Sequence, residues 1–432
     1  NGCCRSSGRR RATTADRKPS CTAVTVAGMD THTLSQPLHL ADVTMFWGPA
    51  SGGVRRYLEA KRAHLAGRAD CRHSLVVPGP HPAWSADDNQ WLRQLPARRL
   101  PAGDGYRFPL RAAPWRDALV ELSPDVIEAG DPYVTAHAAL AAGRRLGVPV
   151  AGFFHSDLSR LLALRFGEWV RPLSSRYLAR LYDRFDWMFA PSEVMAEQLA
   201  DLGVRRVSVQ RLGVDTTVFR PSAANPAALR ETLAVPREAR VLVFAGRNTR
   251  EKHVDQLLET LERLDDRYYL LLIGAGMPST GHPRLRVVDY LRDEHELAGY
   301  LASADALLHA GDAETFGLVI VEAMACGLPV VGVRAGATPE LIDDCVGELA
   351  ERARGPELAR AVERLFERDR DGLGAAARRR AVHAHGWTPQ LERQLMQFAR
   401  LAGRVAPAET RSGTLEEGAL QEQALSPSVP HS

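Results

Sequence analysis

The segment HAGDAETFGLVIVEAMACGLPVVG, residues 309–332, carries the strongest structural signal in the chain. It begins at the end of a short apolar run at 306–310, continues into an apolar helical stretch at 318–326, and ends in a second apolar run at 329–333. Strand, loop, helix and strand in this order indicate a parallel sheet covered by helices. The segment therefore predicts an α/β fold, with its loop at the carboxyl end of a strand, where such sheets bind ligands.

Two carboxylates stand eight residues apart in this segment, Glu314 in the loop and Glu322 in the helix. A carboxylate in such a loop can hold sugar hydroxyls, and one on the helix can accept hydrogen bonds from the paired hydroxyls of a ribose. Gly317 allows a tight backbone at the helix start, where free amides bind anions. The alternative for Glu322 is a helix-surface charge, but its neighbours are apolar, and a buried carboxylate requires a partner.

The same alternation of apolar runs and amphipathic stretches covers most of the chain. The expected strands are 42–47, 74–78, 126–129, 148–155, 187–190 and 207–212, then 241–245, 269–274, 285–288, 306–310 and 329–333. The expected helices are 54–65, 136–146, 173–185, 193–202, 254–264, 294–303 and 318–326, with long helices within 356–404. The expected linker is a break over 213–226, whose last part, 221–226, is rich in Ala, Asn and Pro. Two successive doubly wound sheets place a ligand in the cleft between them.

Composition excludes several classes of protein. The chain has 432 residues, an apolar fraction of 45% and a formal net charge of +3, so nucleic acid is not an expected partner. It contains no run of 18 apolar residues and no C-x-x-C pair, so neither a transmembrane helix nor a zinc site is indicated. Residues 1–28 are polar and Arg-rich. Either they form a targeting peptide or, as we favour, they are translated sequence upstream of a start near Met29.

Three further motifs fall at predicted strand ends. Arg247 and Lys252 flank a loop between a strand and a helix, where two cations make a diphosphate site. Gly52 and Gly53 precede a helix, where backbone amides can approach phosphate. His155 ends the strand in GFFHSD, from where it can donate to a sugar hydroxyl. Taken singly, the two cations are better explained as solvated loop charge and His155 as a structural histidine. The glycine pair alone is as well explained by an ordinary turn, so it is the combination that favours the functional interpretation.

Together these motifs resemble those of retaining glycosyltransferases of family 4, over about residues 41–404. That family has the GT-B architecture, in which two Rossmann-like doubly wound domains face a central cleft and a C-terminal helix crosses back to the first domain. The resemblance implies an acceptor-side domain at 38–219, a nucleotide-sugar-binding domain at 220–385 and a crossover helix at 386–404. A leader at 1–37 and a tail at 405–432 are expected to be disordered.

The resemblance also assigns roles to residues. Glu314 would contact hydroxyls of the donor sugar, Glu322 the ribose, and His155 the sugar near the reacting carbon. Arg247 and Lys252 would hold the diphosphate. The remaining implied contacts are amides of Gly52, Gly53, Phe316, Gly317 and Leu318 on the donor side, and Asp131, Tyr133 and Asp157 on the acceptor side. The family usually has Gly at the position of His253, which leaves the shape of the phosphate loop open.

The implied reaction moves a hexose, with mannose from GDP-mannose favoured, to a lipid-linked or other glycan acceptor with retention at the anomeric carbon. No metal or other cofactor is expected, because the only D-x-D, at 369–371, lies in a charged helix end. Three alternatives stay open. The first is a UDP-hexose or UDP-N-acetylhexosamine transferase with a soluble acceptor, the second is a non-catalytic nucleotide-sugar-binding module, and the third is a nucleotide-sugar epimerase of similar two-domain shape.

We expect a cytoplasmic protein in peripheral contact with the inner face of an anionic membrane. A helix within 54–72 would turn Arg55, Arg56, Arg62 and Arg68 towards solvent, and such charges attract anionic lipid. The segment LLALRFGEW, residues 161–169, adds apolar and aromatic side chains that can enter a membrane interface. The alternative is that residues 161–169 belong to the core.

Overall fold

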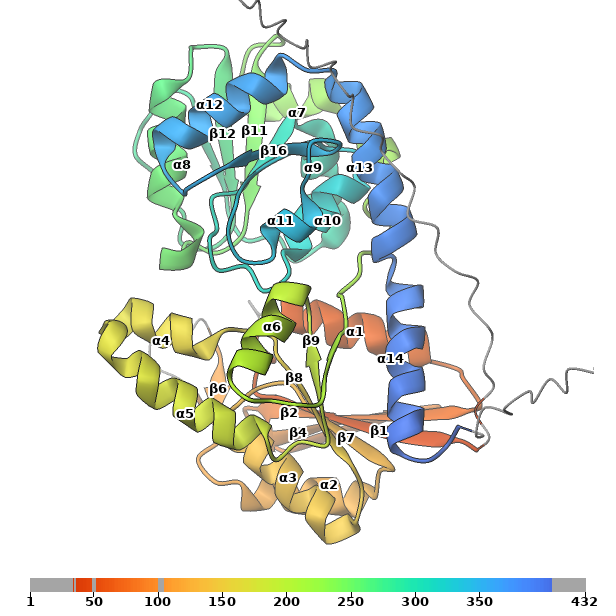
Figure 1. The fold of residues 1–432 in the computed structure, drawn as a ribbon. Helices are drawn as coiled ribbons and strands as arrows, with labels where there is room; N and C mark the ends of the chain where they lie inside the picture. Colours follow the sequence, from red (N-terminus) through yellow and green to blue (C-terminus); the bar gives the residue numbers. More distant parts are fainter. Residues whose placement is uncertain (1–33, 35, 49–51, 100–104, 406–432) are drawn as a thin grey trace, which may run out of the picture.

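Two parallel sheets, each covered by helices, form two domains in the computed structural model (Figure 1). The structure describes residues 34, 36–48, 52–99 and 105–405. The predicted tail beyond residue 405 and most of the predicted leader lie outside these ranges. Leu34, which was expected in the leader, is buried in the same hydrophobic cluster as Leu38, so the packed part of the chain extends beyond the boundary predicted at residue 38.

The first domain contains an eight-stranded sheet of order β10-β9-β8-β7-β1-β2-β4-β3, parallel except for the β3–β4 pair. Its central strands β7 and β8 are buried along their whole length, as is typical of parallel strands with helices on both faces. The strands are β1 Leu38–Val43, β2 Cys71–Gly79, β3 Ala83–Asp87, β4 Gln90–Pro96, β7 Val126–Ala129, β8 Val150–Phe153, β9 Trp187–Ala190 and β10 Val207–Val209, with a separate β5 Arg98–Arg99 and β6 Arg107–Phe108 pair. The helices are α1 Gly53–Leu65, α2 Ala113–Leu122, α3 Val134–Leu146, α4 Leu158–Phe166, α5 Arg171–Tyr182 and α6 Glu193–Asp201, with a 3-10 turn η1 Glu168–Val170.

The second domain contains a six-stranded, wholly parallel sheet of order β13-β12-β11-β14-β15-β16. Its strands are β11 Arg240–Ala245, β12 Tyr268–Ile273, β13 Leu285–Val288, β14 Ala306–Leu308, β15 Val330–Val333 and β16 Gly347–Ala350. Its helices are η2 Pro221–Ala223, α7 Pro226–Thr232, η3 Arg250–Lys252, α8 Val254–Arg263, α9 Glu294–Ser303, α10 Leu318–Ala325, α11 Thr338–Leu341, α12 Gly355–Phe366 and α13 Arg370–His385. The carboxyl ends of β11 and β14 lead into the Arg247 and Glu314 loops, so neighbouring strands bring these two motifs together.

Several strands and helices were not predicted from the sequence, among them the hairpin of β3 and β4. Every residue of β3 is exposed, and β4 pairs with it through a tight turn in which Asp88 has a φ of 45°. The helix α2 and the short helix α4 were also missed. Period-two burial does not develop in an exposed hairpin, so the pattern that predicts strands was absent there.

The chain crosses between the domains at two places that touch each other. At the first crossing, the backbone N–H of Val214 donates to the carbonyl of His385 (2.7 Å), and Val214 forms a parallel bridge with Gly386 at the second. Beyond Val214 the chain already packs on the second domain, where Arg378 donates to the carbonyls of Thr216 and Phe219. The first crossing therefore lies near Gly213, at the start of the break expected over 213–226 and ahead of the domain boundary predicted at residue 219.

After the second crossing, α14, Trp387–Leu401, lies against the first domain (Figure 1). Phe398 packs edge-on to Phe189 of β9, and Gln394 donates to the buried Glu128 carboxylate (2.9 Å). Glu392 pairs with Arg68 at the end of α1. The C-terminal helix thus crosses back to the first domain, as the resemblance implied.

A buried polar network fixes α1 to β1, β7 and α14. Lys61 lies between Asp42 (3.0 Å) and Glu128 (3.1 Å), and the Tyr57 hydroxyl donates to Glu128 (2.9 Å). Burial raises the pKa of Glu128 to about 8 although Lys61 opposes the shift. Buried polar groups of this kind tolerate little rearrangement, because a group left without its partner is costly. The network therefore holds the start of α1 in place.

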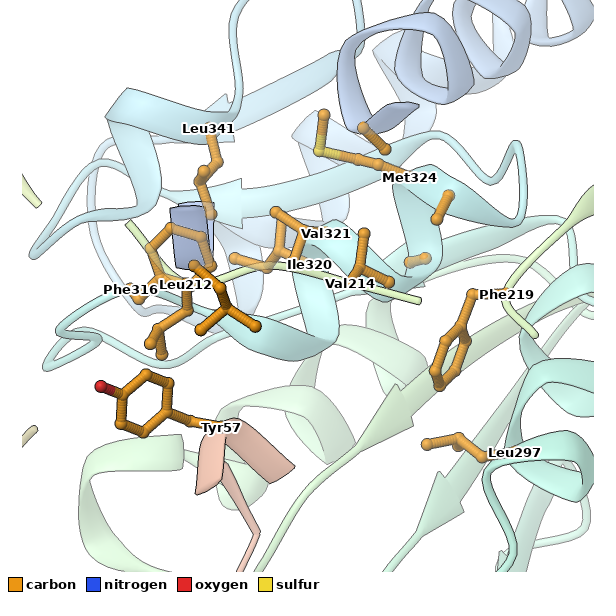
Figure 2. Packing of buried hydrophobic residues seen from close by; sticks show 14 of the residues in the cluster. Tyr57, Leu212, Val214, Phe219, Leu297, Phe316, Ile320, Val321, Met324 and Leu341 are labelled. Carbon is orange, nitrogen blue, oxygen red and sulfur yellow. The ribbon is translucent and has the colours of Figure 1, made fainter. Parts of the chain in front are cut away.

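One hydrophobic cluster continues through both domains and both crossings. It contains Tyr57 of α1, Leu212 and Val214 of the first crossing, and Phe316 and Ile320 at the start of α10 (Figure 2). Within the described residues, no helix is long and apolar enough to cross a bilayer.

We expect Gly213→Ala to destabilise the protein. A Cβ at this position would lie 2.7 Å from the Cα and ring atoms of Trp387, and such overpacking costs about 1–3 kcal/mol. The matched control is Gly299→Ala in α9, where a Cβ meets nothing within 4 Å and helix propensity favours alanine. Urea unfolding followed by circular dichroism compares the two. Equal midpoints for both variants would show that the crossings are not tightly packed.

Candidate active site

A cavity of about 500 Å³ lies between the two domains and is lined by most of the residues singled out from the sequence. The first domain contributes the start of α1, the end of β8 and aromatic side chains; the second contributes the loops after β11 and β14 and the start of α10. The predicted residues that line it are Gly52, Gly53, Tyr133, His155, Arg247, Lys252, Glu314, Phe316, Gly317, Leu318 and Glu322. The fold thus brings together four motifs that are widely separated in the chain.

The start of α10 meets the start of α1 across this cavity. Gly317 is the N-cap of α10 with a φ of 95°, a conformation that strongly favours glycine. Gly53 opens α1, and a Cβ there would lie 3.0 Å from Leu318 Cδ1. Free amides at the starts of two helices therefore face one region, as an anion-binding site requires.

Glu314 lies at the centre of a charged cluster. Its Oε1 accepts from Lys252 Nζ and lies 2.8 Å from Nε2 of the buried His309. Burial alone would raise the pKa of Glu314, but Lys252 and His309 outweigh it and hold the pKa below its usual value. The carboxylate is therefore ionised and can accept hydrogen bonds from hydroxyl groups. His309 is wholly buried and does not line the cavity, so it acts behind Glu314, holding that carboxylate in place.

The phosphate loop follows β11 at Gly246 and contains Arg247 and Lys252, both partly buried at the cavity. The turn closes at His253, which adopts a left-handed conformation with a φ of 48°. That conformation explains why the family usually has glycine there. His253 Nε2 lies 3.1 Å from Asp312 Oδ1, and this partner raises the pKa of His253. The departure from the family pattern therefore leaves the turn of the loop intact.

Glu322 is almost wholly buried on α10 and has the partner that its surroundings require. Its Oε1 accepts from Arg56 of α1, in the other domain. Its second oxygen, Oε2, is buried and has no hydrogen-bond partner among the described residues. One carboxylate oxygen is therefore free to accept a hydrogen bond from a ligand hydroxyl.

His155 is stacked on Phe153, with ring centroids 4.0 Å apart. Burial, followed by the charge of Lys61, lowers the pKa of His155 to about 3, so the ring is neutral near pH 7. Its Nε2 has no partner within the described part of the chain. A neutral imidazole at the cavity can donate or accept one hydrogen bond but brings no positive charge.

The two acceptor-side aspartates do not line the cavity. Asp131 is buried and accepts hydrogen bonds from Met45 N, Tyr133 N, Thr44 Oγ1 and Thr135 Oγ1. Asp157 caps α4 through Arg160 N (3.0 Å) and accepts from Gln198 Nε2 (2.7 Å). The roles predicted for both are therefore corrected: each carboxylate is occupied in holding a loop or a helix end.

Aromatic side chains of the first domain line the cavity instead. Phe46 packs edge-on to Tyr106 (6.1 Å) and to Tyr133 (6.0 Å), and all three line the cavity. Only Tyr133 was expected here. Phe46 and Tyr106 lie in no sequence motif and are 60 residues apart, so only folding shows that they are neighbours.

Comparisons with known proteins agree with this geometry. Residues 51–218 match the family model for glycosyltransferase family 4, and residues 239–368 match that for glycosyl transferases group 1. A GDP-mannose-dependent alpha-(1-6)-phosphatidylinositol dimannoside mannosyltransferase of Mycobacterium tuberculosis strain H37Ra is 30% identical over 364 residues, which cover 80% of this chain and 92% of that protein. This chain belongs to glycosyltransferase family 4.

A second relative is a GDP-mannose-dependent alpha-mannosyltransferase of Mycolicibacterium smegmatis, 31% identical over 346 residues, which cover 77% of this chain and 90% of that protein. Sucrose-phosphate synthase from Thermosynechococcus elongatus is similar in structure, with a TM-score of 0.72 at 18% identity, covering 85% of this chain and 99% of that one. The GT-B architecture and the glycosyltransferase activity inferred from the sequence are thereby confirmed.

The chemistry of a glycosyltransferase explains the arrangement of charges. Breaking the bond between the sugar and the diphosphate leaves negative charge on the departing oxygen. Catalysis requires donors that already point to that oxygen when the charge develops. The helix-start amides, Arg247 and Lys252 lie where the predicted roles require such donors, and Glu314 lies beside them as the predicted acceptor for sugar hydroxyls.

We expect Arg247→Ala and Lys252→Ala each to lower turnover about 10²-fold or more, by analogy with the loss of one oxyanion donor. Neither change should unfold the protein, since both side chains lie at the cavity and not in the core. Arg267→Ala, an exposed cation on the turn before β12, is the control. Steady-state rates at saturating donor and thermal midpoints test this. Turnover of the wild-type size in either variant would disprove the diphosphate assignment.

Proposed function

We propose that this glycosyltransferase moves mannose from GDP-mannose to a lipid-linked glycan acceptor, with retention at the anomeric carbon and without a metal ion. The observation that carries the proposal is the single cavity in which Glu314, Lys252, Arg247 and Glu322 surround two helix starts. These groups match the three parts of a nucleotide sugar, namely hexose hydroxyls, diphosphate and ribose. Glu314 receives the hexose, the two cations receive the diphosphate, and Glu322 receives the ribose.

The choice of GDP-mannose is supported by the relatives. Both mannosyltransferases described above have GDP-mannose in their names, and the matched segments cover at least 90% of each protein's length. Tyr290 and Leu291 of the second domain also line the cavity, and we assign the planar base to these two side chains. A UDP-sugar stays the alternative donor.

Independence from metal is supported by the position of the D-x-D carboxylates. Asp369 caps α13 by accepting from Gly372 N (3.1 Å), and neither Asp369 nor Asp371 lines the cavity. Positive charge at the diphosphate is provided by Arg247 and Lys252, so the leaving group has partners on the protein itself.

The amphiphilic acceptor is supported by an exposed apolar patch on α4, η1 and α5. Phe166, Trp169 and Leu173 are 56%, 71% and 60% exposed, and Leu161 continues the patch into the cavity wall. Exposed arginines accompany it, namely Arg165, Arg171, Arg176 and Arg180. Apolar and aromatic side chains flanked by cations are typical of surfaces that bind anionic membranes. Such a surface would bring a membrane-bound acceptor to the mouth of the cavity.

The basic face of α1 is not part of this surface, contrary to expectation. Arg56 pairs with Glu322, Arg62 donates to the carbonyl of Trp91 (3.1 Å), and Arg68 pairs with Asp70 and Glu392. Arg55 pairs with Glu59 along the helix. These arginines are held in intramolecular pairs, so the argument for membrane contact depends on residues 161–173.

The direct test is sugar transfer from GDP-mannose to a phosphatidylinositol mannoside, measured in parallel with and without EDTA. We expect product at the same rate with and without the chelator, and an α-linkage by NMR. UDP-glucose and UDP-N-acetylglucosamine serve as competing donors. Preference for a UDP-sugar would contradict the donor, and activity restored only by Mn²⁺ or Mg²⁺ would contradict metal independence. Binding of a donor without transfer to any acceptor would favour the non-catalytic module.

Membrane contact predicts co-sedimentation with liposomes that contain anionic phospholipid, stronger at low salt because the charges are screened within about 10 Å at 0.1 M. Replacing Phe166 and Trp169 together by Ala should weaken binding about tenfold or more, since two large apolar side chains lose their contact. Trp84→Ala is the control, because Trp84 is also exposed but lies on β3. Equal, negligible binding to anionic and neutral liposomes would favour a soluble acceptor.

A further inference from the structure

Arg56 is the one cation of the first domain that is held against two carboxylates of the second, among the residues the structure describes. Its guanidinium pairs with Glu322 of α10 through Nη1 and with Glu294 of α9 through Nε (3.2 Å). Burial by itself would lower the pKa of Arg56, but the two carboxylates outweigh it and raise the pKa. The side chain is therefore a fixed charge that joins the two domains beside the cavity.

Only one of the two oxygens of the Glu322 carboxylate accepts a hydrogen bond within the described residues. Arg56 occupies Oε1, while Oε2 is buried without a partner. A buried carboxylate oxygen that accepts no hydrogen bond is costly, so this atom is a site for a donor that comes from a ligand. Arg56 donates to Oε1 alone, and its guanidinium is itself held by Glu294, so the position of Oε1 is restrained. With Oε1 held towards Arg56, Oε2 is the oxygen left for a ligand.

The adjacent residue, Arg55, provides a comparison for the interdomain contact of Arg56. Arg55, one residue earlier, pairs with Glu59 of its own helix (2.7 Å) and lies over the Trp47 ring. Arg55 contacts no residue of the second domain in these pairs. The two adjacent arginines therefore have different partners. Of the two, only Arg56 pairs with a residue that is assigned to donor binding.

We propose that Arg56 is a positioning residue for the nucleotide: from the first domain it orients Glu322 of the second, so that Oε2 accepts from the ribose hydroxyls. The ribose site is then complete only when the two domains face each other as in this structure. A nucleotide is held by groups of the second domain, but its ribose is recognised with help from the first. Nucleotide binding and closure of the cleft are linked through this one side chain.

The proposal rests on the proposed function only in taking the ligand to be a nucleoside diphosphate. The test therefore uses nucleotides and no sugar transfer. Calorimetry measures the Kd of GDP and of 2′,3′-dideoxy-GDP, and of the matching uridine pair, for the wild type, Arg56→Met and the control Arg55→Met. The nucleotide, GDP or UDP, that binds more tightly to the wild type is chosen. The ratio of the Kd of its dideoxy analogue to its own Kd is then compared across the variants.

In the wild type and in Arg55→Met we expect the ribonucleotide to bind roughly 10- to 100-fold more tightly than its dideoxy analogue, the range for hydrogen bonds to a charged group. In Arg56→Met we expect this ratio to fall to about threefold or less, with the Kd of the dideoxy analogue unchanged. A residue that only stabilised the fold would weaken both nucleotides alike, so the ratio isolates the coupling.

Two further variants keep the test decisive if Arg56→Met folds poorly. Glu294→Gln removes the second anchor of Arg56 and should lower the ratio in the same direction by a smaller factor. Arg56→Lys keeps the charge but loses the planar fork and should give an intermediate ratio. The proposal is overturned if the ratio in Arg56→Met or Glu294→Gln equals that of the wild type. It is also overturned if the ribonucleotide binds more tightly to Arg56→Met, or if the wild type shows no preference for ribose. Preference for the uridine pair would contradict the GDP donor but leave the role of Arg56 intact.

Discussion

The contact between the two interdomain crossings is the constraint on which the rest of this structure depends. Gly213 passes so close to Trp387 that no side chain fits between them, and Val214 pairs with the chain at Gly386. Two sheets joined at one such point can face each other in few ways, because each crossing limits the other. The cavity between the domains depends on this arrangement. So do the two helix starts that face each other across it and the Arg56–Glu322 ion pair.

The charges around the cavity are arranged so that each supports a neighbour. His309 and Lys252 keep Glu314 ionised, and Arg56 keeps Glu322 oriented. On the first domain the Lys61 network fixes α1, and with it both Gly53 and Arg56. In a low-dielectric cleft such pairs are strong, and an unpaired charge would be costly. The overall net charge of +3 gives no hint of this local order.

The pairs that join the domains are distributed around the cavity. Arg160 of α4 pairs with Asp312 (3.0 Å), Thr315 Oγ1 donates to the carbonyl of His155 (3.0 Å), and Glu340 accepts from the backbone N–H groups of Glu193 and Val194 at the start of α6. Of these partners, His155 and Thr315 also line the cavity. Part of the contact that holds the domains together is therefore also part of the cavity wall.

By itself the sequence determined the architecture and four charged residues that line the cavity. Glu314, Arg247 and Lys252 follow strands, and Glu322 lies on the next helix, all within local patterns of apolar residues and glycines that chain geometry fixes. Tertiary structure decided what depends on distant residues meeting. It placed Asp131 and Asp157 in structural roles, assembled Phe46 and Tyr106 into an aromatic wall of the cavity, and occupied the arginines of α1 with partners. Arg56 shows the reason: its partner is 266 residues away, and no local periodicity records which carboxylate a long side chain will reach once two domains close on each other.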